Sequence, residues 1–136
     1  MRLKEVQDLN NDTNSPVCIA VDAMGGDFGP SEIVPGAIQA ARNQEMRIFL
    51  VGDPNLLKQE MHKHDVANLQ IKIVPSDSVV EENEQPALAL RNKPNSSILV
   101  ATGLVKQGMA DACVSMGSTG AAMASAVVMF GTIEGI

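Results

Sequence analysis

Four short apolar runs, separated by stretches of helical length, constrain the fold of this chain more than any other feature. Each run is too short to form a helix, and the runs cover residues 17–21, 48–51, 71–74 and 112–114. Successive apolar positions are typical of parallel strands that are buried on both faces. Strands that alternate with helices predict an α/β fold, with a parallel sheet wound with helices on its faces.

The predicted helices are bounded by capping residues. Asp53 and Pro54 form a favourable helix start, with a cap followed by proline at the first helical position. Gly108 is a typical stop for a helix over residues 96–107, where Asn95 or Ser96 would be the cap. Helical segments are also expected over residues 33–41, 86–92 and 121–130.

Composition and charge exclude several classes of function. The chain has 136 residues, a net charge of -6 and only 2% aromatic residues, which argues against nucleic-acid binding. No apolar run approaches the ~20 residues that span a bilayer. The first 16 residues are polar and lack the apolar core of a secretory signal, so we expect a disordered lead. Two cysteines are too few for a disulfide scaffold, so we expect a reduced, cytoplasmic location. Residues 17–136 are then one α/β portion.

The loop after the first predicted strand is a candidate ligand loop. The predicted strand leads through Asp22 into the glycine pair Gly25 and Gly26, and Asp27 comes between this pair and the next helix. Paired glycines let the backbone approach a ligand closely, and N–H groups at a helix start can hold an anion. The two carboxylates would repel phosphate unless a cation or proton intervenes, and Mg²⁺ would suit their oxygens. The alternative is a tight turn whose aspartates cap the helix.

A second candidate loop follows the last predicted strand. Small residues with hydroxyl groups lie between glycines there: Ser115, Gly117, Ser118, Thr119 and Gly120. Amide and hydroxyl donors that converge at a helix start suit a phosphate or an oxyanion. The loop contains no basic residue, and the alternative is an ordinary strand–helix turn in which Ser118 or Thr119 is the cap.

Other polar residues give weaker signals. Arg91 and Lys93 lie a few residues before a helix start and could contact a phosphate or carboxylate group. A solvated helix end followed by a capping serine is the simpler interpretation. His62 and His64 are two residues apart, so they would not face one metal ion on a helix. Cys18 and Cys113 lie in predicted strands, where they are expected to be small buried side chains rather than nucleophiles. No metal site is predicted.

Several segments, taken in order, resemble the bacterial PlsX-type phosphate acyltransferases of phospholipid synthesis. The most specific is Asp-Ala-Met-Gly-Gly-Asp at residues 22–27, within IAVDAMGGDFGP. The others are LVGD at 50–53, EQPALALR at 84–91, NSS at 95–97 and ADACVS at 110–115.

The resemblance implies an acyltransferase that converts an acyl–acyl-carrier-protein and inorganic phosphate into an acyl phosphate and free carrier protein. It also implies a sheet like that of isocitrate and isopropylmalate dehydrogenases, a homodimer, peripheral association with the inner face of the membrane, and no cofactor. Phosphate could attack the thioester directly, so no catalytic side chain is assigned. Gly25, Gly26 and Asp27, with Ser115 and residues 117–120, would line the phosphate and thioester site.

Two residues and the length depart from that family's pattern. Ser118 stands where asparagine is usual, and Met116 stands where alanine is usual. The family's members are more than twice as long, so we expect the chain to be an N-terminal portion with doubtful activity on its own. Two alternatives remain open: a phosphotransacetylase-like enzyme that uses an acyl-CoA, and a non-catalytic anion-binding α/β module.

Overall fold

The computed structural model describes residues 16–136, so the predicted polar lead lies outside the described residues except for Pro16. The strands are β1 (Val17–Asp22), β2 (Met46–Gly52), β3 (Ile71–Pro75) and β4 (Ala112–Ser115). The helices are α2 (Pro30–Asn43), α3 (Pro54–Met61), α4 (Pro86–Asn92), α5 (Ser97–Lys106) and α6 (Thr119–Phe130). Strands and helices alternate as predicted, with the two helices α4 and α5 together between β3 and β4.

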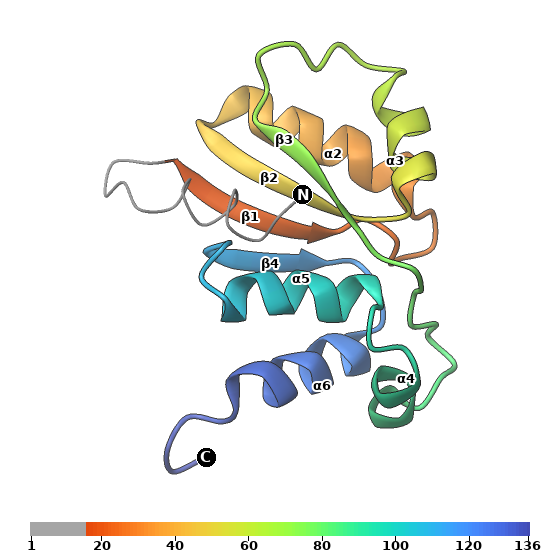
Figure 1. Cartoon of the computed structure of the whole chain (residues 1–136), viewed down its shortest axis with the longest axis vertical. Coiled ribbons are helices and arrows are strands. Elements are labelled where there is room, and N and C mark those ends of the chain that lie inside the picture. Colours follow the sequence, from red (N-terminus) through yellow and green to blue (C-terminus); the bar gives the residue numbers. More distant parts are fainter. Residues whose placement is uncertain (1–15) are drawn as a thin grey trace.

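The four strands form one parallel sheet in the order β3-β2-β1-β4 (Figure 1). The predicted α/β fold with a parallel sheet is therefore confirmed. In the register of β1 and β4, Asp22 pairs with Ser115, and both are the last residues of their strands. The carboxyl ends of these two strands, and the loops that follow them, consequently meet at one edge of the sheet.

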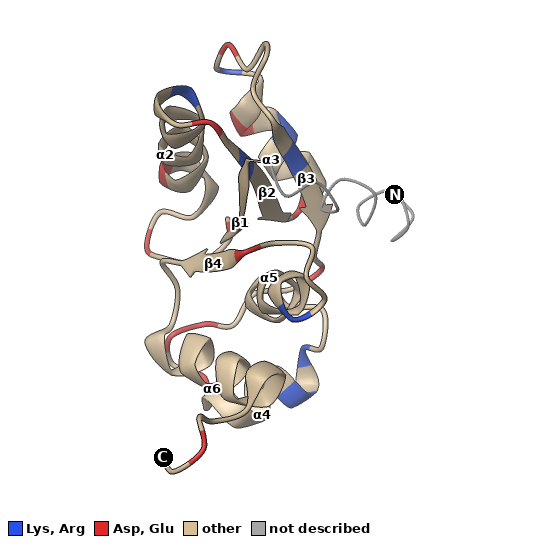
Figure 2. Ribbon diagram, turned by 90° about the vertical axis from the view of Figure 1, so that its left-hand side faces the viewer, with Lys and Arg blue, Asp and Glu red and all other residues tan. Residues whose placement is uncertain are grey.

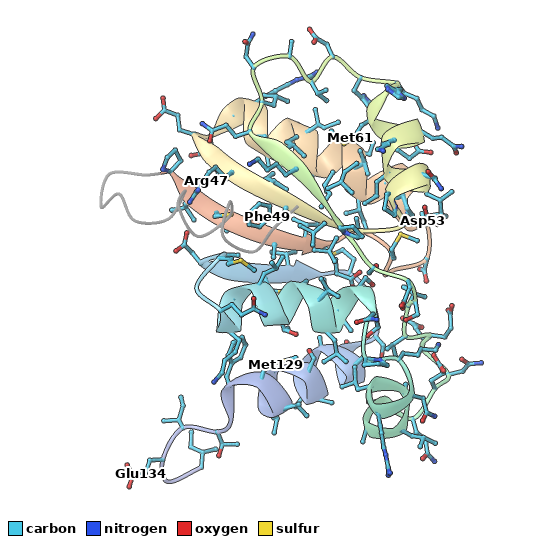
Figure 3. The ribbon with its side chains drawn as sticks, viewed as in Figure 1. Arg47, Phe49, Asp53, Met61, Met129 and Glu134 are labelled. Carbon is cyan, nitrogen blue, oxygen red and sulfur yellow. The ribbon has the colours of Figure 1, made fainter. Side chains whose placement is uncertain are left out.

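Helices cover the two faces of the sheet unequally. On one face α2 and α3 pack against β2 and β3, and their core contains Val34, Ile38 and Leu57. On the other face Phe49 of β2 belongs to a core cluster with residues of α5 (Figure 3). Helix α6 packs on α4 and α5, outside that layer (Figures 1 and 2). No helix among the described residues is long and apolar enough to cross a membrane.

The local signals for the helix ends were mostly correct. The Asp53 side chain accepts hydrogen bonds from the backbone N–H groups of Asn55 and Leu56 at the start of α3. Gly108 has a φ of 71°, in the region that favours glycine, just after α5. Ser96 occupies the N-cap position of α5, but its buried hydroxyl has no hydrogen-bond partner among the described residues, so the predicted side-chain cap is wrong there.

Candidate functional site

The Asp22 carboxylate joins the loops that follow β1 and β4. Its Oδ2 accepts a hydrogen bond from the Ser115 hydroxyl at 2.8 Å. Its Oδ1 faces the backbone N–H groups of Met24 and Gly25, at 3.2 and 3.3 Å. Asp22 is only 3% exposed, and a buried carboxylate needs such donors to replace the water it loses. Asp22 therefore fixes the position of both loops.

Glycines allow the two loops to touch through their backbones. A Cβ atom on Gly25 would lie 2.8 Å from both the Cα and the nitrogen of Gly117, which is too close for any side chain. Gly26 has a φ of 84°, and a Cβ there would lie 3.0 Å from the carbonyl oxygen of Met116. Contact at this distance requires glycine at these two positions.

A polar cavity of about 360 Å³ lies between the loops. Five of the eight predicted site residues line it: Gly25, Gly26, Asp27, Gly117 and Ser118. Segments that are about 90 residues apart in the sequence thus contribute to one concave surface.

The other three predicted residues lie elsewhere. Ser115 is turned toward the Asp22 carboxylate and also accepts a hydrogen bond from the backbone N–H of Gly117. Thr119 and Gly120 are the first residues of α6 and do not line the cavity. A Cβ on Gly120 would meet the ring of Pro86 at 2.7 Å, so this glycine permits close packing of α6 on α4. Ser115 and Gly120 thus make contacts within the fold, whereas Thr119 is exposed at the start of α6.

Residues 79–83 form the third wall of the cavity, which the sequence prediction missed. They belong to an acidic segment that reads as a solvated turn, although it follows the carboxyl end of β3, where ligand loops are expected. Lys93 holds the segment in place, because its ammonium group donates to the carbonyl oxygen of Val79 and to the Glu84 carboxylate. That hydrogen bond lowers the pKa of Glu84. Lys93 is consequently engaged within the fold.

The cavity combines backbone donors with acidic side chains. The N–H groups of Gly26, Asp27 and Ser118 donate to no other residue in the described part of the chain. The side chains of Asp27, Glu81 and Glu82 are acidic, and none of the described lining residues is Lys or Arg. No group of three metal-ligating side chains occurs among residues 16–136. The geometry offers amide donors to an oxyanion without a local positive charge.

Comparison with known proteins identifies the family. The sequence profile of a family described as fatty acid synthesis protein matches residues 17–136, which is nearly the whole chain. The chain belongs to this family. The match includes both glycine-containing loops and the acidic segment, and therefore every wall of the cavity.

Curated relatives of the fatty acid synthesis protein family carry the name phosphate acyltransferase. Those from Trichodesmium erythraeum and Pelotomaculum thermopropionicum are 49% and 51% identical over 89% and 87% of this chain. A third, from Syntrophomonas wolfei, is 48% identical over 87% of the chain. The matched residues are 34–37% of these relatives' own sequences, so the chain spans about a third of their length.

In this member of the fatty acid synthesis protein family, Ser118 caps α6. Its hydroxyl accepts a hydrogen bond from the backbone N–H of Ala121 at 3.3 Å. We expect Ser118→Ala to lower the free energy of unfolding by about 1 kcal/mol, because the substitution removes this cap. Ser118→Asn should change the free energy of unfolding by only about 0.3 kcal/mol, since asparagine is an equally good cap. Urea denaturation of the two variants checks this, and equal losses would contradict the capping role.

Neither cysteine has the properties of a nucleophile. Burial raises the pKa of the Cys18 thiol, and burial with the nearby charge of Asp22 raises the pKa of Cys113 to about 11. At pH 8 only about a thousandth of Cys113 is therefore thiolate, the form that reacts. We expect iodoacetamide to modify the folded protein about 100-fold more slowly than the urea-unfolded protein, with the rate rising tenfold per pH unit from 8 to 10. Rapid modification of the folded protein at pH 8 would contradict this assignment.

Proposed function

We propose that the cavity is the phosphate and thioester site of a phosphate acyltransferase, which transfers a fatty acyl group from an acyl–acyl-carrier-protein to inorganic phosphate. The observation that carries the proposal is that the backbone N–H groups of Gly26, Asp27 and Ser118, which belong to residues lining the cavity, have no hydrogen-bond partner among the described residues. The names of the relatives support the reaction class. The choice of carrier-protein thioester as donor rests on the sequence resemblance.

In the proposed reaction a phosphate oxygen attacks the thioester carbonyl carbon. The carbonyl oxygen becomes an oxyanion, which the N–H groups of Gly26, Asp27 or Ser118 stabilise by hydrogen bonds. Collapse of the tetrahedral intermediate breaks the C–S bond, and the carrier thiolate leaves and takes up a proton. The protein's contribution is to position the two reactants and stabilise charge, so no covalent acyl-enzyme is needed.

The acidic residues of the cavity impose a condition on this reaction. Asp27, Glu81 and Glu82 would repel phosphate, and backbone N–H groups offset only part of that repulsion. The proposal therefore requires a positive charge from outside the lining residues, such as a basic side chain of another segment or of a second copy. A homodimer in the cytoplasm, at the inner face of the membrane, is the setting we propose.

Phosphate-dependent release of thiol tests the function. We expect the protein expressed from its native gene to release thiol from an acyl–acyl-carrier-protein only when phosphate is present, and Gly26→Val to abolish the release. Release from an acyl-CoA alone would instead favour the phosphotransacetylase-like alternative. If neither thioester releases thiol while phosphate still raises the melting temperature, the protein is an anion-binding module and the proposed function is wrong.

A further inference from the structure

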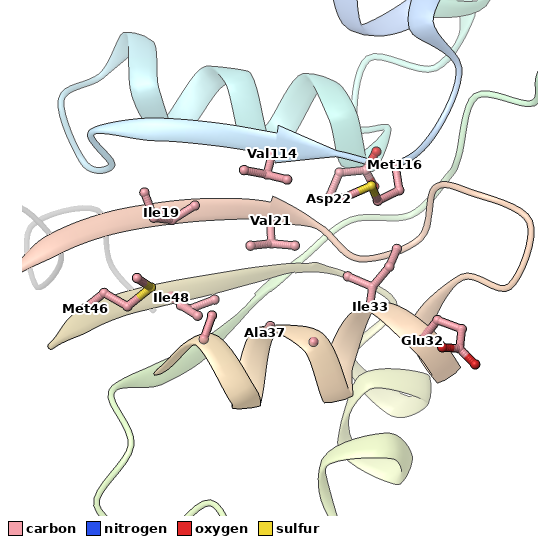
Figure 4. A pocket seen from close by; sticks show the side chains of 12 residues that line it. Ile19, Val21, Asp22, Glu32, Ile33, Ala37, Met46, Ile48, Val114 and Met116 are labelled. Atoms are coloured by element: carbon pink, nitrogen blue, oxygen red, sulfur yellow. The ribbon is translucent and has the colours of Figure 1, made fainter. Parts of the chain in front are cut away.

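A second cavity, distinct in character from the polar one, lies on the face of the sheet beside α2. It is an open groove of about 520 Å³. Its lining is almost entirely apolar, and the side chains of Ile19, Val21 and Val114 face α2 across it (Figure 4). Small residues of α2, namely Gly36, Ala37 and Ala40, form the opposite wall.

The groove exists because α2 covers only part of this face. Helix α2 packs over β2, while α5 covers the opposite face of β1 and β4. Among the described residues no element covers β4 on the α2 side, and Val114 is 40% exposed there. An exposed apolar surface of this kind commonly marks a binding site.

The groove begins at the candidate site. Asp22 and Met116 line one end of it, and Met116 is also the residue whose backbone contacts Gly26. The Asp22 carboxylate thus separates the apolar groove from the polar cavity, since it bonds to the amide of Gly25 and to Ser115. A molecule with a polar head in the cavity would pass outside this contact, along the exposed side chain of Met116, to place an apolar tail in the groove.

We propose that the groove binds the hydrocarbon chain of the acyl thioester. This inference rests on the proposed function and names the part of the substrate that the groove recognises. From Asp22 back to Ile19 the groove follows three residues of β1, about 10 Å at the rise of a strand. With C–C bonds of about 1.5 Å in a zigzag, this length accommodates about eight methylene groups.

The chemistry of the lining favours an aliphatic chain over an extended peptide. A peptide buried there would need partners for its backbone N–H and C=O groups. Among the side chains of the described lining only those of Asp22 and Glu32 are polar, and Asp22 already accepts three hydrogen bonds. A hydrocarbon chain needs no such partners and gains from leaving water.

The test uses simple thioesters with acyl chains of different length. S-butanoyl- and S-decanoyl-N-acetylcysteamine are titrated into the 136-residue chain, with methyl NMR of Val21, Ile48 and Val114 as the readout. We expect the decanoyl compound to bind at least tenfold more tightly, since each fully buried methylene contributes up to about fourfold. It should also shift the three sets of methyl signals. Equal affinities, or signals that do not move, would overturn the inference.

A variant that fills the groove gives the second arm. A Cβ on Gly36 would meet no atom within 4 Å, so Gly36→Leu should fold and place its side chain in the groove. It should lower the decanoyl-to-butanoyl affinity ratio at least tenfold, whereas the matched control Gly36→Ala should leave the ratio nearly unchanged. Val114→Thr, which keeps the shape but adds a hydroxyl, should also lower the ratio.

These results separate the groove from the reaction. Chain-length-dependent binding without phosphate-dependent thiol release would support the groove and refute the proposed function. Thiol release that is independent of chain length and unaffected by Gly36→Leu would refute the groove alone. If Gly36→Leu instead changes the oligomeric state, with no effect on thioester binding, the groove is a contact between copies and the inference is wrong.

Discussion

Asp22→Ala is expected to lower the free energy of unfolding by about 3–5 kcal/mol, because three hydrogen-bond donors lose their acceptor at once. Each donor that stays buried without a partner costs roughly 1–3 kcal/mol. The same substitution disconnects the loops after β1 and β4. Loss of stability should therefore be accompanied by loss of any phosphate-induced rise in melting temperature.

Asp22→Asn is the matched control. The amide oxygen can still accept from Met24 and Gly25, and the amide nitrogen can donate to the Ser115 hydroxyl, so the loss should stay below about 1.5 kcal/mol. Urea denaturation with both variants measures the difference. If the two substitutions lower the free energy of unfolding equally, the hydrogen bonds of Asp22 do not hold the two loops together. The description of the site would then be wrong.

Two glycine-to-alanine substitutions are expected to act in opposite directions. Gly25→Ala should destabilise the protein by about 2–3 kcal/mol, since its Cβ would meet the backbone of Gly117 at 2.8 Å and neither loop can move without breaking the Asp22 contacts. Gly36→Ala should stabilise it by about 0.5–1 kcal/mol, because the position is inside α2, has space around it, and alanine favours helix.

Thermal and urea unfolding of both variants check this pair. A gain in the free energy of unfolding for Gly36→Ala would show that the assay resolves an effect of helix propensity. The larger loss for Gly25→Ala can then be assigned to the contact between the loops. A Gly25→Ala variant as stable as the parent would show that the two loops do not touch in solution, and the polar cavity would then lack its defined shape.

Much of the fold could be predicted because its signals are local. The apolar runs predicted the four strands to within two residues at each end. The cap at Asp53 and the stop at Gly108 are side-chain and backbone preferences that act within a few residues. The helix expected over residues 33–41 instead begins at Pro30, so Pro35 lies inside α2.

The candidate site was predictable only in part, since its remaining features depend on packing between distant segments. The rule that ligands bind beyond the carboxyl ends of strands pointed to the loops after β1 and β4, and the structure brings residues of both to one cavity. Nothing local shows that Glu81 and Glu82 face the same cavity, because their position depends on the Lys93 contacts. Likewise, the apolar groove follows from what α2 leaves uncovered.

The tie between the ends of β1 and β4 also bears on the order in which the protein folds. Asp22 and Ser115 are separated by 93 residues, as are Cys18 and Asp111, whose hydrogen bond joins the other ends of the same strands. Strands β1, β2 and β3 pair through shorter crossovers, whereas β4 must pair with β1 across 93 residues. We therefore expect the cavity to form after β1, β2 and β3 have paired, so a partly folded chain that lacks β4 would have no ligand site to occupy.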